Sequence, residues 1–453
     1  MNLKEKRFLV AGTGKSGIAA AELLKKQGFA VRLYDGNTEL DIQSFYEKNP
    51  NLQNIEILLG DLSEEDQKAV DILVLSPGIP VDLPMVNTMR DLGAAIWGEI
   101  ELAYAFAKGE ILAITGTNGK TTTTSLLGEI LKSHFADVRV VGNIGIPYTS
   151  VAADTTEETV TAAEISSFQL ETIHRFAPGI TAILNITPDH LNRHHTMENY
   201  IAAKESITKN QKPEDLCVLN YEDEVLRKFG EGLQTKVAWF SSKRELENGF
   251  YVKEDAIYRA CDGEITEIIR TNELNLLGRH NYENVMAAVA MALGIGVPLN
   301  AVRETLRRFT AVEHRIEYVA EKRGIRFYND SKATNPDAAI QGIGAMNRPT
   351  YLIGGGYDKE SVYDEWFDAF HGKVKELVLI GQTRDKIAET AKKHGFTAVT
   401  LADSMEEAVA VCYDHAKSGD AVLLSPACAS FGMFKNYEER GRIFKEIVRS
   451  LKE

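Results

Sequence analysis

The chain has 453 residues, of which 44% are hydrophobic and 26% charged. At about 150 residues per domain, this length predicts about three domains and excludes a small fold held together by disulfides. The 51 basic and 65 acidic residues give a formal net charge of −14, so we expect neither a nucleic-acid partner nor a membrane partner. The four cysteines form no Cys-x-x-Cys pair, and no apolar run approaches 18 residues, which favours a cytoplasmic protein.

Short apolar runs alternate with helical patterns along the first hundred residues. An amphipathic helix is expected at residues 16–27, and a helical run at 97–108. The strand-like runs are residues 8–11, 30–34, 55–59 and 72–75. Because strands that alternate with helices form parallel sheets, this part of the chain is expected to be a Rossmann-like domain. We place its end at residue 99.

The strand-like run 111–115 starts a second unit of strand, glycine-rich turn and helix, in an α/β block that is expected to extend over residues 100–311. It combines a parallel sheet of the P-loop ATPase kind with a small β-rich part near residues 237–269. The third block, residues 312–453, again alternates strands and helices and is expected to be Rossmann-like. The sequence therefore predicts an α/β protein of three domains, 1–99, 100–311 and 312–453.

The first glycine-rich segment, Gly12 to Gly17, has the pattern G-x-G-x-x-G between a strand and a helix. Asp35 ends the next strand, close to the spacing of an acid that binds a ribose. Glycines there let the backbone approach a diphosphate at the helix N-terminus. The pattern is short, so a dinucleotide site, another nucleotide site and a tight turn without a ligand all remain open at this point.

The second glycine-rich segment carries the sharper signal. Gly116-Thr117-Asn118-Gly119-Lys120-Thr121-Thr122 follows an apolar strand and precedes a helical run. Its backbone amides can surround phosphate oxygens, Lys120 can reach the β- and γ-phosphates, and the Thr121 hydroxyl can bind Mg²⁺. The usual Walker pattern has a glycine where this chain has Ile114, so the loop is a shortened variant. A lysine at a helix N-terminus opposes the helix dipole unless an anion is bound there, which favours ATP.

Four segments together resemble the Mur ligases of peptidoglycan synthesis. They occur in the order of that family: residues 116–122 (GTNGKTT), 164–169 (EISSFQ), 187–191 (TPDHL) and 330–335 (DSKATN). Residues 425–441 are similar to the D-glutamate-adding branch. The resemblance spans nearly the whole chain. It implies an ATP- and Mg²⁺-dependent ligase whose substrates are UDP-N-acetylmuramoyl-L-alanine and D-glutamate.

By this resemblance, the first glycine-rich segment binds UDP and not NAD. Some relatives carry an arginine shortly after the acid at position 35, whereas this chain has Gly36 and Asn37, and Lys15 is a candidate to supply the missing charge. The residues that the resemblance assigns to the UDP substrate are Gly14, Lys15, Ser16, Gly17, Asp35, Ser76, Gly78, Asn143 and Ser166.

Glu164 ends an apolar run and can face the phosphate loop, where a carboxylate suits Mg²⁺. His190 and His194 have the spacing of a zinc helix, but position 191 is leucine and no cysteine pair is near, so zinc is not favoured. By resemblance, His190 binds a second metal ion, while His194 and His195 are interpreted as surface residues.

Lys204 lies in a helical run, and its local sequence alone would predict an exposed lysine. The resemblance implies instead that CO₂ carbamylates it to a carboxylate-like metal ligand. That chemistry needs a neutral amine, so Lys204 should be partly desolvated with a lowered pKa. The expected metal ligands are Thr121, Glu164, His190 and Lys204, and the expected catalytic residues are Lys120, His190 and Lys204.

The third block opens with a polar cluster, residues 330–335, next to a predicted helix N-terminus, which suits a substrate carboxylate or a plain helix cap. By resemblance, the D-glutamate residues are Lys332, Thr334, Lys359, Ser430 and Tyr437. The ATP residues are Gly116, Thr117, Asn118, Gly119, Lys120, Thr121, Thr122, Asn284, Arg315 and Asp330.

The expected reaction activates the substrate carboxylate as an acyl phosphate, which the D-glutamate amine then attacks. The nearest alternatives are other ATP-dependent ligases of the superfamily: the L-alanine-adding enzyme, the diamino-acid-adding enzyme and folylpolyglutamate synthase. A dehydrogenase that uses the first glycine-rich segment and a non-enzymatic nucleotide switch are the alternatives of other classes. We expect a monomer.

Overall fold

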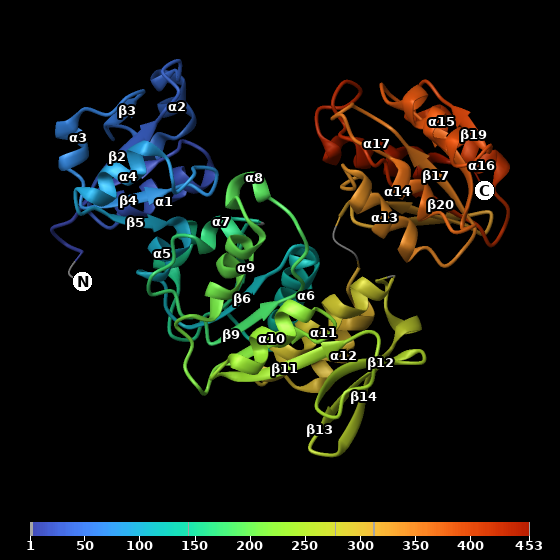
Figure 1. The fold of residues 1–453 in the computed structure, drawn as a ribbon, viewed down its shortest axis with the longest axis horizontal. Coiled ribbons are helices and arrows are strands. Elements are labelled where there is room, and N and C mark those ends of the chain that lie inside the picture. The colour runs from blue at the N-terminus through green and yellow to red at the C-terminus, as the bar shows by residue number, and fades with distance from the viewer. Residues whose placement is uncertain (1–2, 144, 277, 311–312, 453) are drawn as a thin grey trace. The chain divides into compact units, whose positions relative to one another are not determined.

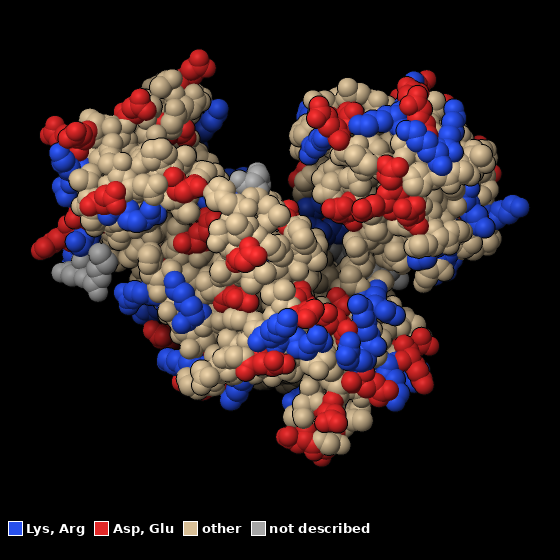
Figure 2. Space-filling view, in the orientation of Figure 1, with Lys and Arg blue, Asp and Glu red and all other residues tan. Residues whose placement is uncertain are grey.

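The computed structural model describes residues 3–143, 145–276, 278–310 and 313–452. The chain divides into two compact units, the first formed by residues 1–270 and 283–306 and the second by residues 271–282 and 307–453. No helix among the described residues is long and apolar enough to cross a bilayer. Acidic and basic side chains lie interspersed over the face drawn in Figure 2.

The first sheet of the first unit is entirely parallel, with the order β3-β2-β1-β4-β5. Its strands, blue to cyan in Figure 1, are β1 (Arg7–Ala11), β2 (Ala30–Asp35), β3 (Ile57–Leu59), β4 (Ile72–Leu75) and β5 (Ala95–Gly98). Successive side chains of a strand point to opposite faces. Phe8 and Val10 therefore pack with α1 (Lys15–Lys26) on one face, and Leu9 and Ala11 pack with α4 (Pro84–Asp91) on the other. The expected Rossmann-like arrangement is present.

The connection from the first sheet to the second is short and firmly held. The helix expected over residues 97–108 is α5 (Glu99–Tyr104) alone, because residues 95–98 pair with β4 as a strand. Glu101 on α5 is buried and accepts hydrogen bonds from the backbone amides of residues 174–176 at 2.8–3.1 Å. Glu99 accepts from the amide and hydroxyl of Thr149. These carboxylates tie the first sheet to the second.

Short elements of the first unit are α2 (Ile42–Lys48), α3 (Glu64–Lys68) and the 3₁₀ helices η1 (Pro50–Leu52), η2 (Tyr148–Ser150) and η3 (Ala152–Asp154).

The second sheet has nine strands in the order β14-β13-β12-β11-β10-β9-β6-β8-β7. They are β6 (Glu110–Thr115), β7 (Val138–Gly142), β8 (Val160–Glu164), β9 (Ile180–Ile183), β10 (Leu216–Asn220), β11 (Lys236–Ser241), β12 (Gly249–Lys253), β13 (Ala256–Cys261) and β14 (Glu264–Arg270). The strands pair in parallel except around β13, which is antiparallel to both its neighbours and forms the hairpin that projects in Figure 1. Strands β11 to β14 together form the β-rich part that the sequence predicts near residues 237–269.

Helices that follow the strands cover the second sheet. They are α6 (Lys120–Lys132), α7 (Ser167–Leu170), α8 (Leu191–His194), α9 (Met197–Glu205), η4 (Ser206–Thr208), α10 (Glu224–Gly232), α11 (Arg279–Gly294) and α12 (Leu299–Arg308), with η5 (Thr271–Glu273) before α11. Because parallel strands end at one edge, the loops after β6, β8 and β9 lie close together, and this edge carries the site.

The second unit holds the third sheet, with the order β15-β16-β20-β17-β18-β19. Its strands are β15 (Glu317–Lys322), β16 (Ile325–Asn329), β17 (Thr350–Gly354), β18 (Val374–Leu379), β19 (Val399–Leu401) and β20 (Ala421–Leu424). Only β15 is antiparallel to its neighbour. One face packs against α13 (Pro336–Ala345), α14 (Asp364–Asp368) and α15 (Arg384–Lys393), and the other against α16 (Met405–His415) and α17 (Tyr437–Ser450). The predicted α/β fold of three domains is confirmed.

Candidate phosphate and metal site

The phosphate loop joins β6 to α6 through two glycines that no other residue would replace easily. Gly116 has φ +148° and Gly119 φ +85°, both in the region that side chains disfavour. A Cβ on Gly119 would lie 2.1 Å from Asn284 Oδ1, so the loop also packs too closely there for a side chain. The helix α6 begins directly at Lys120, and its first turn holds no acidic residue. Its free amide groups therefore favour an anion.

Two lysine ammonium groups converge on a single carbonyl of this loop. Lys120 Nζ donates to the carbonyls of Gly116 and Thr117 at 2.8 and 2.9 Å, and Lys204 Nζ donates to the same Gly116 oxygen at 2.8 Å. Lys204 is 2% exposed. Burial, reinforced by the charge of Lys120, lowers the pKa of Lys204 to about 7. The arrangement concentrates positive charge beside the helix N-terminus and makes half of the Lys204 amines neutral near pH 7.

Tyr200 connects these groups and is absent from the sequence predictions. Its hydroxyl lies 3.0 Å from Thr117 Oγ1, and the Lys204 ammonium lies 4.6 Å from the centre of its ring. Tyr200 precedes Lys204 by four residues on α9, so both side chains lie on one helix face. This four-residue spacing is the sequence pattern that could have identified Tyr200. Tyr200 holds the lysine against the phosphate loop.

Glu164, at the end of β8, presents an unsatisfied oxygen. Its Oε1 accepts from Asn143 Nδ2 at 2.8 Å, whereas its Oε2 is buried without a partner among the described residues. A buried carboxylate oxygen with no donor is costly unless a cation binds it. Thr121 and Thr122 are buried in the first turn of α6. The oxygen donors at this edge of the sheet are of the kind that Mg²⁺ prefers.

The three histidines around α8 have different environments. His190 has φ +53°, leaves its side chain 52% exposed and packs its ring against Phe168 at 4.9 Å. The surface interpretation of His194 is wrong, since it is only 4% exposed and stacks on Phe168. Its ring lies within hydrogen-bond distance of Ser167 Oγ, and burial lowers its pKa to about 4. His195 is exposed beside Asp82.

Asn284 lies on α11 in the first unit and is buried against the phosphate loop. The Thr123 hydroxyl donates to its Oδ1 at 3.3 Å. Asn118, in the same loop, exchanges hydrogen bonds with the Asn185 side chain at 2.8 and 3.1 Å. The structure therefore brings together Gly116 to Thr122, Glu164, Lys204 and Asn284, which are 168 residues apart at their extremes in the sequence.

The first glycine-rich segment forms a tight turn into α1. A Cβ on Gly17 would lie 1.9 Å from the Gly12 carbonyl oxygen, so only glycine fits. Asp35 accepts from the Thr13 amide and hydroxyl at 3.1 and 2.5 Å and from the Asn37 amide at 3.0 Å. Burial alone would raise the pKa of Asp35, but these hydrogen bonds outweigh it and lower the pKa. Asp35 thus holds the loop, with Gly14, Lys15 and Ser16 at the start of α1.

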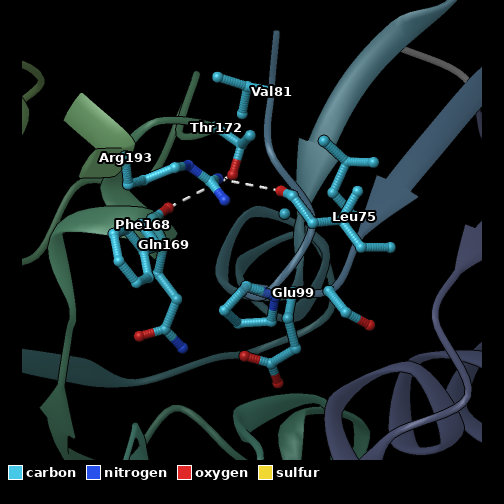
Figure 3. A pocket seen from close by; sticks show the side chains of 11 residues that line it. Leu75, Val81, Glu99, Phe168, Gln169, Thr172 and Arg193 are labelled. Carbon is cyan, nitrogen blue, oxygen red and sulfur yellow. Dashed lines mark hydrogen bonds between the residues drawn. The ribbon is translucent and has the colours of Figure 1, made fainter. Parts of the chain in front are cut away.

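Ser76 and Gly78 follow β4 beside this turn. Ser76 lines a small cavity that Leu75, Phe168 and Arg193 also line, and Figure 3 shows Leu75 across from Phe168 and Arg193. Arg193 donates to the Ile79 carbonyl at 2.9 Å and to Glu171 at 2.7 Å. The Ser76 hydroxyl is buried without a partner among the described residues. Sequence reasoning missed Arg193, which links α8 to the first sheet. Ser166 caps α7 in a capping box with Gln169.

In the second unit, the segment 330–335 follows β16. Asp330 is buried and accepts from the Ser425 hydroxyl at 2.7 Å and from the Ile316 amide at 3.3 Å. Burial raises its pKa to about 7. The Lys332 ammonium lies 5.5 Å from the centre of the Tyr437 ring. Asn335 caps α13, and Thr334 precedes it, so the helix N-terminus is adjacent to these polar groups.

Arg440, which the sequence analysis did not identify, joins the two loops that carry these groups. It is fully buried, and its guanidinium donates to the Ser331 hydroxyl and carbonyl at 2.9 and 2.8 Å and to the Cys428 carbonyl at 3.0 Å. Ser430 is buried in the second of these loops. Arg440 therefore fixes the segment 330–332 against the segment 428–430. Lys359 is exposed in the loop that follows Gly355 and Gly356, which both have positive φ.

Arg315 lies directly before the buried Ile316 in the segment that leads into β15. Its side chain is half-buried, and its Nε has no hydrogen-bond partner among the described residues. A buried guanidinium nitrogen without an acceptor suits an anionic ligand. Arg315 thus belongs to the polar groups of the second unit, with Asp330 and Tyr437.

Comparisons with protein families cover most of the chain. Residues 6–98 match the Mur ligase MurD-like N-terminal domain, residues 114–292 the Mur ligase middle domain, and residues 314–428 the Mur ligase, glutamate ligase domain.

Curated relatives and solved structures agree with these matches. Proteins named UDP-N-acetylmuramoylalanine--D-glutamate ligase from Lachnoclostridium phytofermentans and Lachnospira eligens are 55% and 54% identical to the chain, and each alignment covers 100% of both sequences. The UDP-N-acetylmuramate-alanine ligase of Thermotoga maritima has the same fold, with a TM-score of 0.62, 20% identity and coverage of 99% of this chain and 100% of the other. The MurF ligase of Thermotoga maritima, solved in complex with ADP, has a TM-score of 0.57, 17% identity and coverage of 99% of both chains.

Proposed function

Because this chain belongs to the Mur ligase family and its closely similar curated relatives are D-glutamate ligases, we infer that it adds D-glutamate to UDP-N-acetylmuramoyl-L-alanine at the expense of ATP. The reaction makes a precursor of peptidoglycan. A cytoplasmic location, where ATP is available, and a monomeric state are parts of this proposal. So are the domain boundaries at residues 99 and 311.

The observation that carries the proposal is the phosphate loop with its two converging lysines. Lys120 and Lys204 share the Gly116 oxygen at the N-terminus of α6. Positive charges and free amides in one place are stabilised by a polyphosphate. Following the resemblance, we assign ATP to Gly116, Thr117, Asn118, Gly119, Lys120, Thr121, Thr122, Asn284, Arg315 and Asp330.

The residues beside the loop fit Mg²⁺. The observation that tests this fit is Glu164 Oε2, a buried carboxylate oxygen for which the described residues provide no donor. Thr121, Glu164, His190 and a carbamylated Lys204 would hold the two expected ions, with His190 on the second. When bound, Mg²⁺ neutralises charge on the phosphates during transfer.

Lys204 fits the carbamylation that its role requires. Its amine is half neutral near pH 7, and burial protects a carbamate from water. Tyr200 and the Gly116 carbonyl hold the side chain in place. A carbamate there would replace one of the two positive charges by a negative one and so remove the repulsion between Lys120 and Lys204.

The amino acid and the UDP group would bind to polar groups described above. We assign D-glutamate to Lys332, Thr334, Lys359, Ser430 and Tyr437, and the UDP substrate to Gly14, Lys15, Ser16, Gly17, Asp35, Ser76, Gly78, Asn143 and Ser166. Because both oxygens of Asp35 accept hydrogen bonds from Thr13 and Asn37, its part would be to shape the loop. Lysines and hydroxyls suit the two carboxylates of D-glutamate.

The reaction follows from these assignments. A carboxylate oxygen of the alanyl group attacks the γ-phosphorus of ATP, the bond to the β-phosphate oxygen breaks, and ADP leaves with its electron pair. The D-glutamate amine, after losing a proton, attacks the resulting acyl phosphate, and phosphate leaves from the tetrahedral intermediate to give the amide. Lys120 and the loop amides stabilise the charge of the transferring phosphoryl group.

One assay tests the proposed function against its alternatives. Purified full-length chain is incubated with ATP, Mg²⁺ and UDP-N-acetylmuramoyl-L-alanine, and phosphate release is measured with a panel of amino acids. Release that depends on D-glutamate supports the proposal. Phosphate release with another amino acid would identify a different ligase. Binding of NADH would identify a dehydrogenase, and nucleotide binding without phosphate release would identify a nucleotide switch.

A further inference from the structure

The segment that carries Arg315 has an unusual backbone. Its neighbours His314 and Ile316 have φ +67° and +47°, in the left-handed region that residues with a Cβ seldom adopt. For the β-branched Ile316 this conformation is particularly unfavourable. Such a backbone persists only where the surrounding structure holds it. The contacts that hold this turn therefore decide where Arg315 points.

Lys445, on α17, supplies one of these contacts from 130 positions later in the sequence. It is 7% exposed, and its ammonium lies 2.6 Å from Glu313 Oε1 and 2.9 Å from Glu317 Oε1. Glu313, His314 and Glu317 have the geometry of a metal site, but the ammonium already lies against both carboxylates. The cluster is thus an internal ion pair of one lysine with two glutamates. Burial alone would lower the pKa of Lys445, and the two carboxylates raise it above its usual value.

Glu317 transmits this contact to the turn. While its Oε1 pairs with Lys445, its Oε2 accepts from the His314 amide at 3.0 Å and from Asn329 Nδ2 at 2.9 Å. Asn329 Nδ2 also lies 2.8 Å from His314 Nδ1. A Cβ on Gly441 of α17 would lie 2.2 Å from the same ring nitrogen, so the helix packs directly on His314. His314 is held by Glu317, Asn329 and α17 together.

The turn carries a buried guanidinium nitrogen, Arg315 Nε, that has no hydrogen-bond partner in the described part of the chain. The segment 330–332 is bonded to this turn, since the Lys332 amide donates to the His314 carbonyl at 3.1 Å and the Ile316 amide to Asp330 at 3.3 Å. It also has an anchor of its own in Arg440, which donates two hydrogen bonds to Ser331. Disturbing Lys445 should therefore affect Arg315 more than the segment 330–332.

We propose that Lys445 is a positioning residue for nucleotide binding: its ammonium fixes Glu317, Glu317 fixes the left-handed turn at His314, and the turn orients Arg315, which the proposed function assigns to ATP. This inference rests on the proposed function, because it assigns ATP as the ligand of Arg315. By this inference, Lys445 on α17 contributes to ATP affinity through Arg315 and not by touching the nucleotide.

The test measures KM for ATP, D-glutamate and UDP-N-acetylmuramoyl-L-alanine in the full-length chain. Lys445→Met should raise KM for ATP about tenfold, a coupling typical of residues in one charged network, and leave KM for D-glutamate within about twofold. Lys445→Arg keeps a cation that reaches both glutamates and should restore most of the ATP affinity. Arg449→Met removes an exposed charge from the same helix and serves as the matched control, with all three constants unchanged.

A double-mutant cycle separates positioning from general destabilisation. If Lys445 acts through Arg315, Arg315→Ala combined with Lys445→Met should have the same KM for ATP as Arg315→Ala alone. Equal increases in all three KM values, or additive effects in the cycle, would overturn the inference. If Lys445→Met does not fold, Glu317→Gln takes its place, because it removes the Lys445–Glu317 ion pair and keeps the shape of the side chain. A wild-type chain without D-glutamate-dependent phosphate release would overturn the proposed function itself, and this inference with it.

Discussion

Replacing Lys204 with methionine should stabilise the first unit, and more so at low pH than at high pH. Burial lowers the pKa of Lys204 from 10.5 to about 7. Between these values the unfolded chain binds one more proton than the folded chain, so Lys204 lowers the free energy of unfolding. This penalty is complete below pH 7 and disappears as the pH rises through 10.5. At about 1.36 kcal/mol per pKa unit, the penalty is about 5 kcal/mol at pH 6 and about 2 kcal/mol at pH 9.

The difference between the two pH values is the quantity to measure. Methionine also loses the hydrogen bond to the Gly116 carbonyl and the contact of the ammonium with the Tyr200 ring. These losses are present at both pH values and cancel when the two are subtracted. The stability gained by Lys204→Met should therefore be about 3 kcal/mol larger at pH 6 than at pH 9.

Urea unfolding in CO₂-free buffer without nucleotide provides the assay. In a Trp366→Phe background the remaining tryptophans, Trp97 and Trp239, both lie in the first unit and report its unfolding. Lys228→Met, at an exposed lysine of α10, is the control and should show a pH dependence below about 0.5 kcal/mol. A gain for Lys204→Met that is equal at pH 6 and pH 9 would refute the argument that burial suppresses the charge of Lys204.

Three further predictions concern the same edge of the sheet and its support. Lys120→Ala should lower the rate of D-glutamate-dependent phosphate release at least about hundredfold, because it removes a preorganised charge from the transferring phosphoryl group; near-normal turnover would contradict the ATP assignment. Lys204→Ala should abolish ligation, and added bicarbonate, whose oxygens replace the carbamate, should restore part of it; a fully active variant would refute the role of Lys204. Glu101→Gln should lower the free energy of unfolding of the first unit by about 1–3 kcal/mol in urea titrations, because one buried oxygen of the carboxylate can no longer accept amide hydrogen bonds. An unchanged urea midpoint would show that this contact does not tie the two sheets.

The phosphate loop was predictable because its determinants are local. A strand, two glycines and a helix start occur within about ten residues, and the positive φ values of Gly116 and Gly119 agree with that pattern. The alternation of strands and helices likewise predicted three parallel-dominated sheets. The same logic failed at residues 97–98, where pairing with β4 overrides a helical pattern.

The burial of polar side chains could not be predicted from the sequence. His194 reads as a surface residue, yet the fold around α8 places it under Phe168. Lys204 would be exposed on its own helix, and it becomes buried only through contact with a loop 88 residues earlier. Arg440 and Lys445 are similar cases, since Ser331, which binds Arg440, and Glu313, which binds Lys445, lie more than 100 positions away in the sequence. Such contacts depend on the tertiary fold and leave no local pattern.

The central claim, that the loop 116–122 binds the phosphates of ATP, is tested most directly by a crystal structure of the chain with ADP and Mg²⁺. The account predicts that the β-phosphate lies against the amides at the start of α6, with the Lys120 ammonium moved from the Gly116 carbonyl to the phosphate oxygens. Nucleotide bound elsewhere, with Lys120 still on that carbonyl, would contradict it.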